Sequence, residues 1–205
     1  MAPTLRIGFL GANGSFCEEA AAVHAARLGR EAEFLGATEL GSAAPAAVLA
    51  ALAGGRCELA VLPVANSTAG LVWPTLQALG TRAFELVDEI VLPVRFALFT
   101  ARAELALAEI ERVASHPMAF KQCARSLARL LPHLSPQRLA LACSDTASAA
   151  RDLAAGRLDA CTAVLASERT GTRHGLALLA RDVHDQPDNR TFFAVLRHTR
   201  EPVVE

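Results

Sequence analysis

Short apolar runs alternate with amphipathic runs along the whole chain. Residues 5–10 form an apolar run of strand length, and residues 16–28 repeat apolar positions at helical spacing. Ser15 occupies the N-cap position of that helix, Glu18 completes the sequence pattern of a capping box, and Gly29 supplies a stop. The opening of the chain therefore predicts a strand followed directly by a helix.

The same alternation continues to the end of the chain. Strand-length apolar runs occupy residues 32–35, 58–64, 112–115, 138–143, 159–163, 176–180 and 191–198. Helical patterns occupy residues 42–53, part of 65–80, 117–131, 145–155 and 163–173. This order of strands and helices predicts an α/β fold with parallel-rich sheets that are flanked by helices.

Two segments predict that the chain divides into two lobes. Pro93 interrupts the long apolar run 85–100, which indicates two strand segments joined by a bend, as in a chain that crosses between lobes. The polar segment "HDQPDN", residues 184–189, marks the return. We therefore expect one lobe of residues 1–94 and 184–205, a second lobe of 95–183, and a ligand cleft between the lobes.

Composition and charge narrow the range of partners. The chain is 52% hydrophobic and 20% charged, which is typical of a globular protein. Its formal net charge of −1 provides no field to attract nucleic acid or an anionic membrane surface, so neither partner is expected. The five cysteines include no C-x-x-C pair, and the N-terminus lacks a secretory pattern; both features favour the cytoplasm.

Three loops follow a predicted strand and precede a helix or a turn. They comprise residues 11–16, 63–70 and 115–120. In parallel sheets such loops lie at the carboxyl edge, where ligands bind and free N–H groups face anions. The first loop is interpreted as a tight turn or an anion loop, and the second as a capped turn or a binding site. The glycines of the first loop lack dinucleotide spacing, so no nucleotide cofactor is expected.

His116 precedes Pro117 and is a candidate proton carrier or metal ligand. The other histidines show no ligand spacing, so no metal site is expected. The simpler interpretation is that His116 caps the following helix or is hydrogen-bonded in the cleft wall.

Four segments, in order along the chain, resemble the catalytic domain of prephenate dehydratases. "IGFLGANGSFCEEAA" resembles the opening glycine loop of that family, and "LAVLPVANSTAGLV" resembles its P-x-E-N-S-x-x-G segment. "VASHPMAFKQC" resembles the S-H-P-x-A-x-x-Q-C segment, and the stretch that ends in "DNRTFFAVL" resembles the N-x-T-R-F motif. The resemblance runs from about Ile7 to about Leu196, over nearly the whole chain.

The resemblance implies a two-lobed fold like that of type II periplasmic binding proteins. It also implies a cytoplasmic lyase of phenylalanine biosynthesis that converts the small molecule prephenate to phenylpyruvate without a metal or organic cofactor, as a homodimer. Prephenate carries two carboxylates and a ring hydroxyl, and loss of water and CO₂ makes its ring aromatic. The enzyme has to hold the carboxylates and help the hydroxyl to depart.

The family's motifs assign roles to individual positions of this sequence. Thr191 is the family's catalytic threonine, and its neutral hydroxyl is expected to donate a hydrogen bond to the leaving hydroxyl. Polar groups of the substrate would be held by Asn66, Ser67, Ser15 and the backbone of Gly14. Phe16 and Phe193 would pack against the ring of the substrate. The expected substrate-binding set comprises Gly14, Ser15, Phe16, Asn66, Ser67, Thr68, His116, Arg190, Phe192 and Phe193.

Two positions depart from the family pattern. Phe192 stands where the family has arginine, and Ala65 where it has glutamate, which removes one cation and one anion from the expected site. Arg190 shares a strand face with position 192 and is a candidate substitute for the missing cation. The sequence ends at Glu205 and encodes no regulatory ACT domain like that of many relatives, so feedback by that route is not expected.

Three functions remain open on the sequence alone. A prephenate dehydratase, a carbon–oxygen lyase, is favoured by Thr191, Asn66 and Ser67. A non-aromatising prephenate decarboxylase of a specialised pathway, a carbon–carbon lyase, is favoured by Phe192, because a carboxylate in apolar surroundings releases CO₂ more readily. The third is a non-catalytic protein that binds a small acid.

Overall fold

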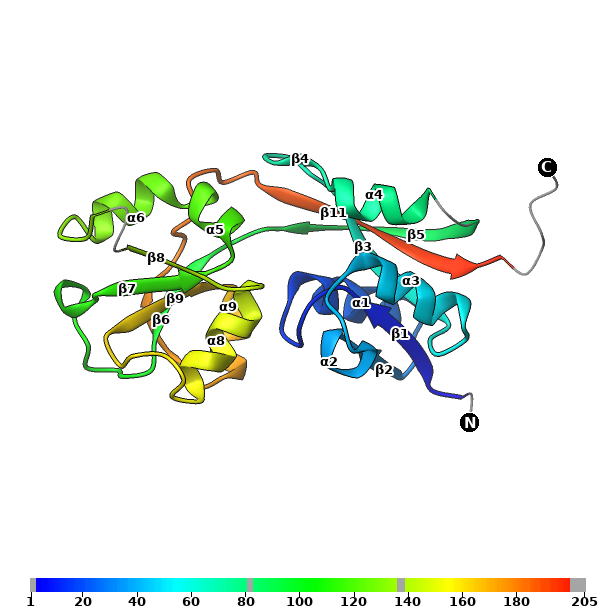
Figure 1. Ribbon diagram of the computed structural model, residues 1–205, viewed down its shortest axis with the longest axis horizontal. Coiled ribbons are helices and arrows are strands. Elements are labelled where there is room, and N and C mark those ends of the chain that lie inside the picture. Colours follow the sequence, from blue (N-terminus) through cyan, green and yellow to red (C-terminus); the bar gives the residue numbers. More distant parts are fainter. Residues whose placement is uncertain (1–2, 81–82, 136–138, 200–205) are drawn as a thin grey trace. The chain divides into compact units, whose positions relative to one another are not determined.

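The computed structural model describes residues 3–80, 83–135 and 139–199 and contains two compact units (Figure 1). Unit 1 holds the described residues up to Pro93 and from Asn189 onward, and unit 2 holds Val94–Asp188. Residues 184–188 belong to unit 2, whereas the sequence pattern placed them in the first lobe. The reason lies in Asp185, whose N–H donates to the carbonyl of Gln122 at 2.7 Å and whose carboxylate accepts from the N–H of Ser126 at 2.9 Å.

Unit 1 is built on a mixed sheet with the strand order β2-β1-β3-β11-β5, and β4 pairs with β3. Its strands are β1 (Leu5–Phe9), β2 (Ala32–Leu35), β3 (Leu59–Asn66), β4 (Gly70–Leu71), β5 (Phe84–Pro93) and β11 (Arg190–His198). Its helices are α1 (Phe16–Arg27), α2 (Ala37–Leu40), α3 (Pro45–Ala53) and α4 (Trp73–Leu79). Strand β1 is parallel to both of its neighbours, as the alternating pattern predicts. Strand β11 is antiparallel to β3 and β5, because the chain returns from unit 2 to form it.

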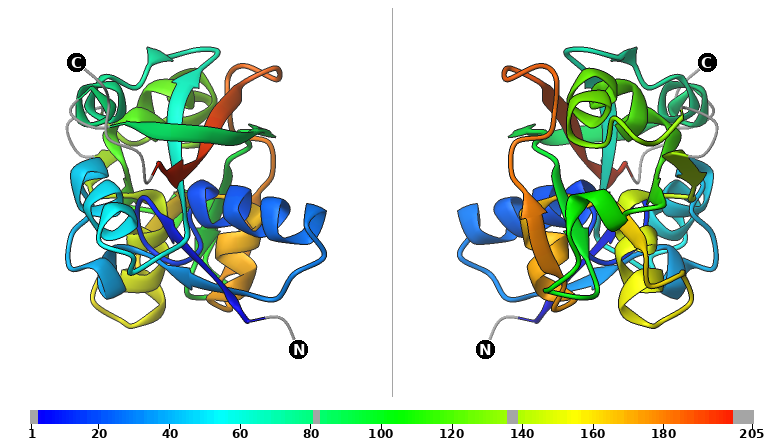
Figure 2. Two further views of the ribbon diagram at one scale, coloured as in Figure 1. Left: turned by 90° about the vertical axis from the view of Figure 1, so that its right-hand side faces the viewer. Right: turned by 90° about the vertical axis from the view of Figure 1, so that its left-hand side faces the viewer.

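Helices α1 and α3 cover opposite faces of this sheet (Figure 2). Alternate residues of β11 supply the two cores: Phe193 and Val195 pack with α1, and Ala194 and Leu196 pack with α3. This period of two assigns a face to each residue of β11, including those at the start of the strand.

The start of α1 departs from the capping box that the sequence predicts. The Ser15 hydroxyl accepts from the backbone N–H of Glu18 at 3.4 Å, as expected. The Glu18 carboxylate, however, accepts from the backbone N–H of Gly14 instead of closing the box on Ser15. Because Glu18 is only 6% exposed, this carboxylate is part of the interior and ties the glycine loop to the helix.

Asp88 on β5 anchors a polar cluster against α1. Its carboxylate lies 2.8 Å from Nδ1 of His24, accepts from Nη1 of Arg27 at 3.1 and 3.2 Å, and accepts from the N–H of Glu89 at 2.8 Å. Arg27 also donates to the carbonyl of Glu89 at 3.3 Å. Partial burial works against the charged form of Asp88, but these hydrogen bonds outweigh it and hold the pKa of the carboxyl below its ordinary value.

Replacing Asp88 with asparagine is expected to destabilise the protein at neutral pH by roughly 1–3 kcal/mol. Since the folded-state pKa of Asp88 is depressed, its contribution is present above the unfolded-state value of about 3.9 and is lost as the pH falls through the folded-state pKa. The difference in free energy of unfolding between the two proteins should therefore be constant near neutral pH and shrink below about pH 4. Denaturant unfolding across this pH range measures it.

Glu85→Gln is the matched control on the same strand. Glu85 pairs with Arg197 at 2.8 Å, but their side chains are 48% and 56% exposed, so we expect a loss below about 1 kcal/mol. Equal losses for the two variants would contradict the role given to the Asp88 cluster.

Unit 2 contains a second mixed sheet with the order β10-β6-β9-β7-β8. Its strands are β6 (Ala97–Thr100), β7 (Arg112–Ser115), β8 (Ala140–Ala142), β9 (Thr162–Ala166) and β10 (Ala177–Ala180). Its described helices are α5 (Pro117–Gln122), α6 (Ala124–Leu130), α8 (Thr146–Ala154), α9 (Glu168–Arg173) and the short 3₁₀ turn η1 (Leu107–Glu109). Helix α8 packs on the sheet through Ala149, Ala150 and Leu153.

Two elements of unit 2 differ from the sequence prediction. The helix expected over 117–131 is interrupted at Cys123, whose φ of −124° and ψ of 10° separate α5 from α6. Residues 163–166, expected to start a helix, belong to β9, and every residue of that strand is buried. A fully buried strand has a continuous apolar run, which periodicity cannot distinguish from a buried helix.

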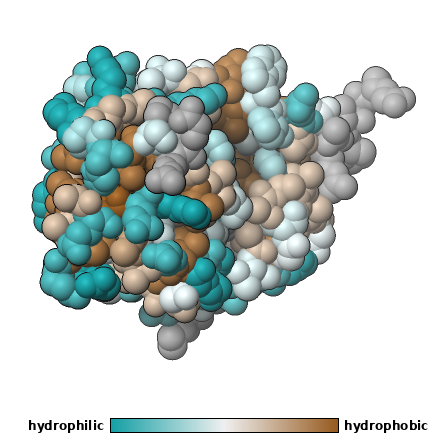
Figure 3. Space-filling view, turned by 60° about the vertical axis from the view of Figure 1, so that its left-hand side comes forward, coloured by the Kyte–Doolittle hydropathy of each residue, from teal (hydrophilic) through white to brown (hydrophobic). Residues whose placement is uncertain are grey.

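Within the described ranges, no helix has both the length and the apolar character needed to cross a bilayer. On the face drawn in Figure 3, hydrophilic side chains interrupt the hydrophobic surface.

Candidate active site

The topology of unit 1 brings three predicted segments to one edge of its sheet. Strands β1 and β3 are parallel and end toward the same edge, where β3 continues from Val61, the partner of Phe9, for five more residues to Asn66. Strand β11 is antiparallel to β3 and begins there, with Thr191 opposite Asn66. This carboxyl edge is where ligands bind in sheets of this kind.

Asn66 and Thr191 form the centre of the site. The Asn66 amide nitrogen, Nδ2, lies 2.9 Å from Oγ1 of Thr191, 2.8 Å from Oδ1 of Asn189 and 3.1 Å from the carbonyl oxygen of Arg190. Thr191 is half-buried, and Asn189 is 2% exposed. The threonine is therefore held at the sheet edge by a side-chain network.

Ser67 and Thr68 build the turn that carries Asn66. The hydroxyl of Ser67 accepts from the N–H of Arg190 at 2.9 Å, and the N–H of Ser67 donates to the carbonyl of Arg190, also at 2.9 Å. The N–H of Thr68 donates to Oδ1 of Asn66 at 2.9 Å. Both residues are exposed; Ser67 fastens the end of β3 to the start of β11, and Thr68 closes the turn on Asn66.

In the glycine loop, residues 11–16, polar groups that were expected to bind substrate make hydrogen bonds within the protein. The N–H of Gly14, expected to bind substrate, donates to the Glu18 carboxylate, and its role toward substrate stays a prediction. Ser15 is the helix cap, and its hydroxyl lies 3.4 Å from the carbonyl of Leu10. Phe16 is partly buried and packs against the core on the α1 face.

The two phenylalanines of the motif point to opposite faces of the sheet. The hydrogen bond between Asn66 and Thr191 places their side chains on one face, so Ala65 and Phe192, which pair directly across the strands, lie on the other. Both departures from the family pattern thus fall on one cross-strand pair, opposite the face of the threonine hydroxyl. Phe193 is 1% exposed in the core, where it supports the strand beneath Thr191.

Arg190 and His116 are the remaining predicted residues. Arg190 begins β11, is exposed, and makes no ion pair with another described residue. His116 belongs to unit 2, where its Nδ1 accepts from the N–H of Met118 at 3.1 Å and caps α5. This is the capping arrangement that the sequence favours for His116.

Asn189 is a site residue that sequence reasoning did not single out. It opens the N-x-T motif, and its Oδ1 accepts from Asn66. The signal was available, since an asparagine directly before a strand in a polar turn is a common hydrogen-bonding position.

Cysteine and metal chemistry receive no support from the described part of the chain. Cys123 is fully buried, and burial raises the pKa of its thiol to about 12, so it is protonated at neutral pH. Across residues 3–80, 83–135 and 139–199, no group of three or more His, Cys, Asp or Glu side chains is placed to hold a metal ion.

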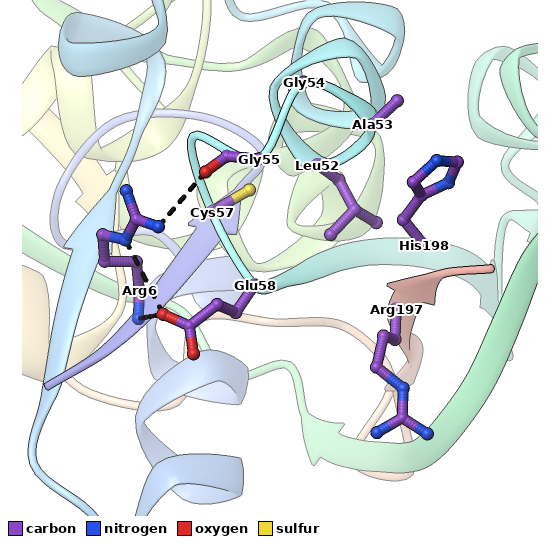
Figure 4. A pocket seen from close by; sticks show the side chains of 9 residues that line it. All are labelled: Arg6, Leu52, Ala53, Gly54, Gly55, Cys57, Glu58, Arg197 and His198. Carbon is purple, nitrogen blue, oxygen red and sulfur yellow. Dashed lines mark hydrogen bonds and ion pairs between the residues drawn. The ribbon is translucent and has the colours of Figure 1, made fainter. Parts of the chain in front are cut away.

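A groove of about 560 Å³ lies at the opposite end of the same sheet (Figure 4). Its charged side chains are already engaged: Arg6 donates to the carbonyl of Gly55 at 3.1 Å and pairs with Glu58, and Arg197 pairs with Glu85. Because β11 runs from Thr191 to this groove at its far end, the groove is separate from the candidate site.

Comparisons with known proteins find the same family that the sequence motifs at this edge resemble. The family model described as prephenate dehydratase matches residues 7–201. A curated prephenate dehydratase of Mycolicibacterium vanbaalenii is 34% identical over 204 residues, which cover 96% of this chain and 62% of the relative. Arogenate dehydratase/prephenate dehydratase 2 of Arabidopsis thaliana is 35% identical over 147 residues, 72% of this chain and 36% of the relative.

A solved structure shares the fold. The prephenate dehydratase of Arthrobacter aurescens, in complex with L-Phe, superposes with a TM-score of 0.80 and 27% identity, over 98% of this chain and 62% of that chain. The chain spans less than two thirds of the length of each of these relatives. With matched motifs, a matched fold and a family model that covers nearly all of its residues, the chain belongs to the prephenate dehydratase family.

Proposed function

We propose that this protein is a carbon–oxygen lyase that converts prephenate to phenylpyruvate in phenylalanine biosynthesis. The observation that carries the proposal is Thr191, the threonine of the family motif, held at the carboxyl edge of unit 1 by Asn66 at 2.9 Å. The ordered match to prephenate dehydratases over residues 7–201 supports the choice of substrate. The dimer and the cytoplasmic location stay predictions.

The proposed reaction needs little covalent chemistry from the protein. The bond between the ring and its carboxylate breaks, and its electron pair enters the ring as CO₂ leaves. The ring hydroxyl departs with its own electron pair and takes up one proton, which solvent ultimately supplies, to leave as water. Because the product ring is aromatic, the enzyme has to orient the substrate and stabilise the departing oxygen.

Thr191 is proposed to donate a hydrogen bond to the departing hydroxyl. The turn formed by Ser67 and Thr68 offers further polar groups at the same edge, and Ser15 is proposed to contribute its hydroxyl, which also caps α1. Exposed Arg190, directly before Thr191, is proposed to hold one substrate carboxylate in place of the missing arginine. Because Arg190 shares the strand face of Phe192, its side chain would have to reach the Thr191 hydroxyl around the end of β11, where it is the first residue.

The position of Phe192 bears on the choice between dehydration and decarboxylation without aromatisation. An apolar ring at this position favours a decarboxylase only where it surrounds a substrate carboxylate. Phe192 pairs with Ala65 on the face opposite the Thr191 hydroxyl, which weakens that reason. The retained threonine favours dehydration.

Purified protein mixed with prephenate tests the proposal. We expect a strong ultraviolet signal of phenylpyruvate that grows with enzyme concentration. Consumption of prephenate without an aromatic product would select the decarboxylase instead. Saturable binding without consumption would select a non-catalytic binding protein, and the same assay with arogenate tests the alternative substrate.

A further inference from the structure

The hydrogen bonds around Asn66 fix which way its side-chain amide points. Its Oδ1 lies 2.9 Å from the backbone nitrogen of Thr68 and 2.9 Å from that of Ala69. Backbone N–H groups only donate, so an acceptor has to face them, and the carbonyl oxygen of the amide is the only acceptor that the Asn66 side chain has. The NH₂ group of Asn66 therefore faces Asn189 and Thr191.

The same bonds fix the direction of the contact with Thr191. The amide carries two protons, and the two nearest acceptors are Oδ1 of Asn189 at 2.8 Å and Oγ1 of Thr191 at 2.9 Å. Thr191 thus accepts from Asn66 and does not donate to it. Within the described part of unit 1, no acceptor takes the proton of the Thr191 hydroxyl.

Asn189 accepts from the Asn66 amide on the other side. Its side chain is 2% exposed, and its Oδ1 receives the second amide proton of Asn66. Turning the Asn66 amide over would set its NH₂ against two backbone N–H groups, whichever way the Asn189 amide points. Both of those hydrogen bonds would be lost, so the observed orientation is the favoured one.

We propose that Asn66 is a positioning residue that makes Thr191 a hydrogen-bond donor toward the substrate. By filling the acceptor site of the threonine hydroxyl, Asn66 leaves its proton directed at the departing oxygen. The donated bond also polarises the hydroxyl, which strengthens the bond that Thr191 gives. This role rests on the proposed dehydration, because the departing hydroxyl is the acceptor that the proton meets.

Asn66→Asp tests the direction of the bond with little change in shape. The carboxylate keeps an acceptor for Thr68 and Ala69, but its second oxygen also accepts, so it takes the Thr191 proton away from the substrate. We expect kcat to fall roughly 10²-fold at neutral pH, at the low end of what a positioned proton donor contributes, with KM changed much less. Rates are compared with those of the wild type at each pH.

Lowering the pH should restore the Asn66→Asp variant. Once the introduced carboxylate is protonated, its O–H can donate to Thr191 as the amide did, so the kcat ratio to wild type should rise toward one. Among the described residues that hydrogen-bond to Asn66, Arg190 is the charged one. It accepts through its backbone carbonyl, and the residue is exposed. Asn66→Ala is the matched control, because it loses both donor and acceptor and should show a deficit that does not recover with pH. A kcat of Asn66→Asp equal to that of wild type, or a deficit that does not change with pH, would overturn the proposal.

A measurement without turnover separates this inference from the proposed function. In ¹⁵N-labelled protein, Thr191→Val removes the acceptor, so the signal of one side-chain amide proton of Asn66 should move as that proton exchanges Thr191 for the carbonyl of Arg190, while the backbone N–H signals of Thr68 and Ala69 stay in place. An unmoved Asn66 signal would overturn the assigned direction. If the wild type makes no phenylpyruvate, the proposed function fails, and this shift still decides whether Thr191 accepts from Asn66.

Discussion

Replacing Thr191 with valine is expected to reduce kcat for phenylpyruvate formation by roughly 10²–10⁴-fold. Valine keeps the branched shape of threonine and removes the one group proposed to meet the departing hydroxyl. The fold should survive, because Asn66 retains the carbonyl of Arg190 at 3.1 Å as an acceptor, and the lost hydrogen bond costs about 1 kcal/mol. Initial rates at saturating prephenate, together with thermal unfolding, measure both quantities.

Thr191→Ser is the matched control for this prediction. Serine retains the hydroxyl and loses only a methyl group, so most of the activity should remain. A valine variant as active as the serine variant would mean that the hydroxyl takes no part in the reaction.

Replacing Phe193 with alanine is expected to lower the free energy of unfolding by about 3–5 kcal/mol. The ring is 1% exposed and belongs to the core that includes Ile7, Phe9 and Ile90, so its removal leaves a cavity that rigid strands cannot close. The neighbouring Phe192→Ala is the matched control. Since Phe192 is only half-buried on the other face, we expect a loss of about 1 kcal/mol.

Denaturant unfolding of both variants checks the comparison. Equal losses would contradict the assignment of the two rings to opposite faces. Phe193→Leu, which keeps most of the volume, separates support of the strand from contact with substrate. A raised KM in that variant would show that the ring also touches prephenate, as the family resemblance implies.

Much of the local structure follows from short-range patterns. The strand predicted over residues 112–115 matches β7, and the helix predicted over 145–155 matches α8 at Thr146–Ala154 to within one residue at each end. The break at Pro93 was also predicted, because proline cannot donate within a sheet. The interruption at Cys123 was not predicted, since nothing in the residues from 117 to 131 breaks a helix.

Glu18 illustrates what local patterns cannot supply. Its spacing from Ser15 predicts a capping carboxylate near solvent, and the helix does begin there. The structure buries Glu18 and turns it toward the N–H of Gly14, because the loop folds back over the first turn of α1. A contact made by loop closure depends on the packing around it and not on the spacing of two residues.

The motifs of the sequence by themselves determined the family resemblance and marked Thr191 and Asn66, because residue type and spacing are properties of the chain. Only the tertiary structure decided what these residues do to each other. Pairing of β11 with β3 sets Thr191 opposite Asn66 and Phe192 opposite Ala65, and a register shift between Phe192 and Phe193 separates these pairs from the core-facing ones, so spacing along the chain does not give them. The direction of the bond to Thr191 was likewise settled by the backbone N–H groups of Thr68 and Ala69, and the Asn66 amide also donates to Asn189, which lies 123 residues from Asn66 along the chain.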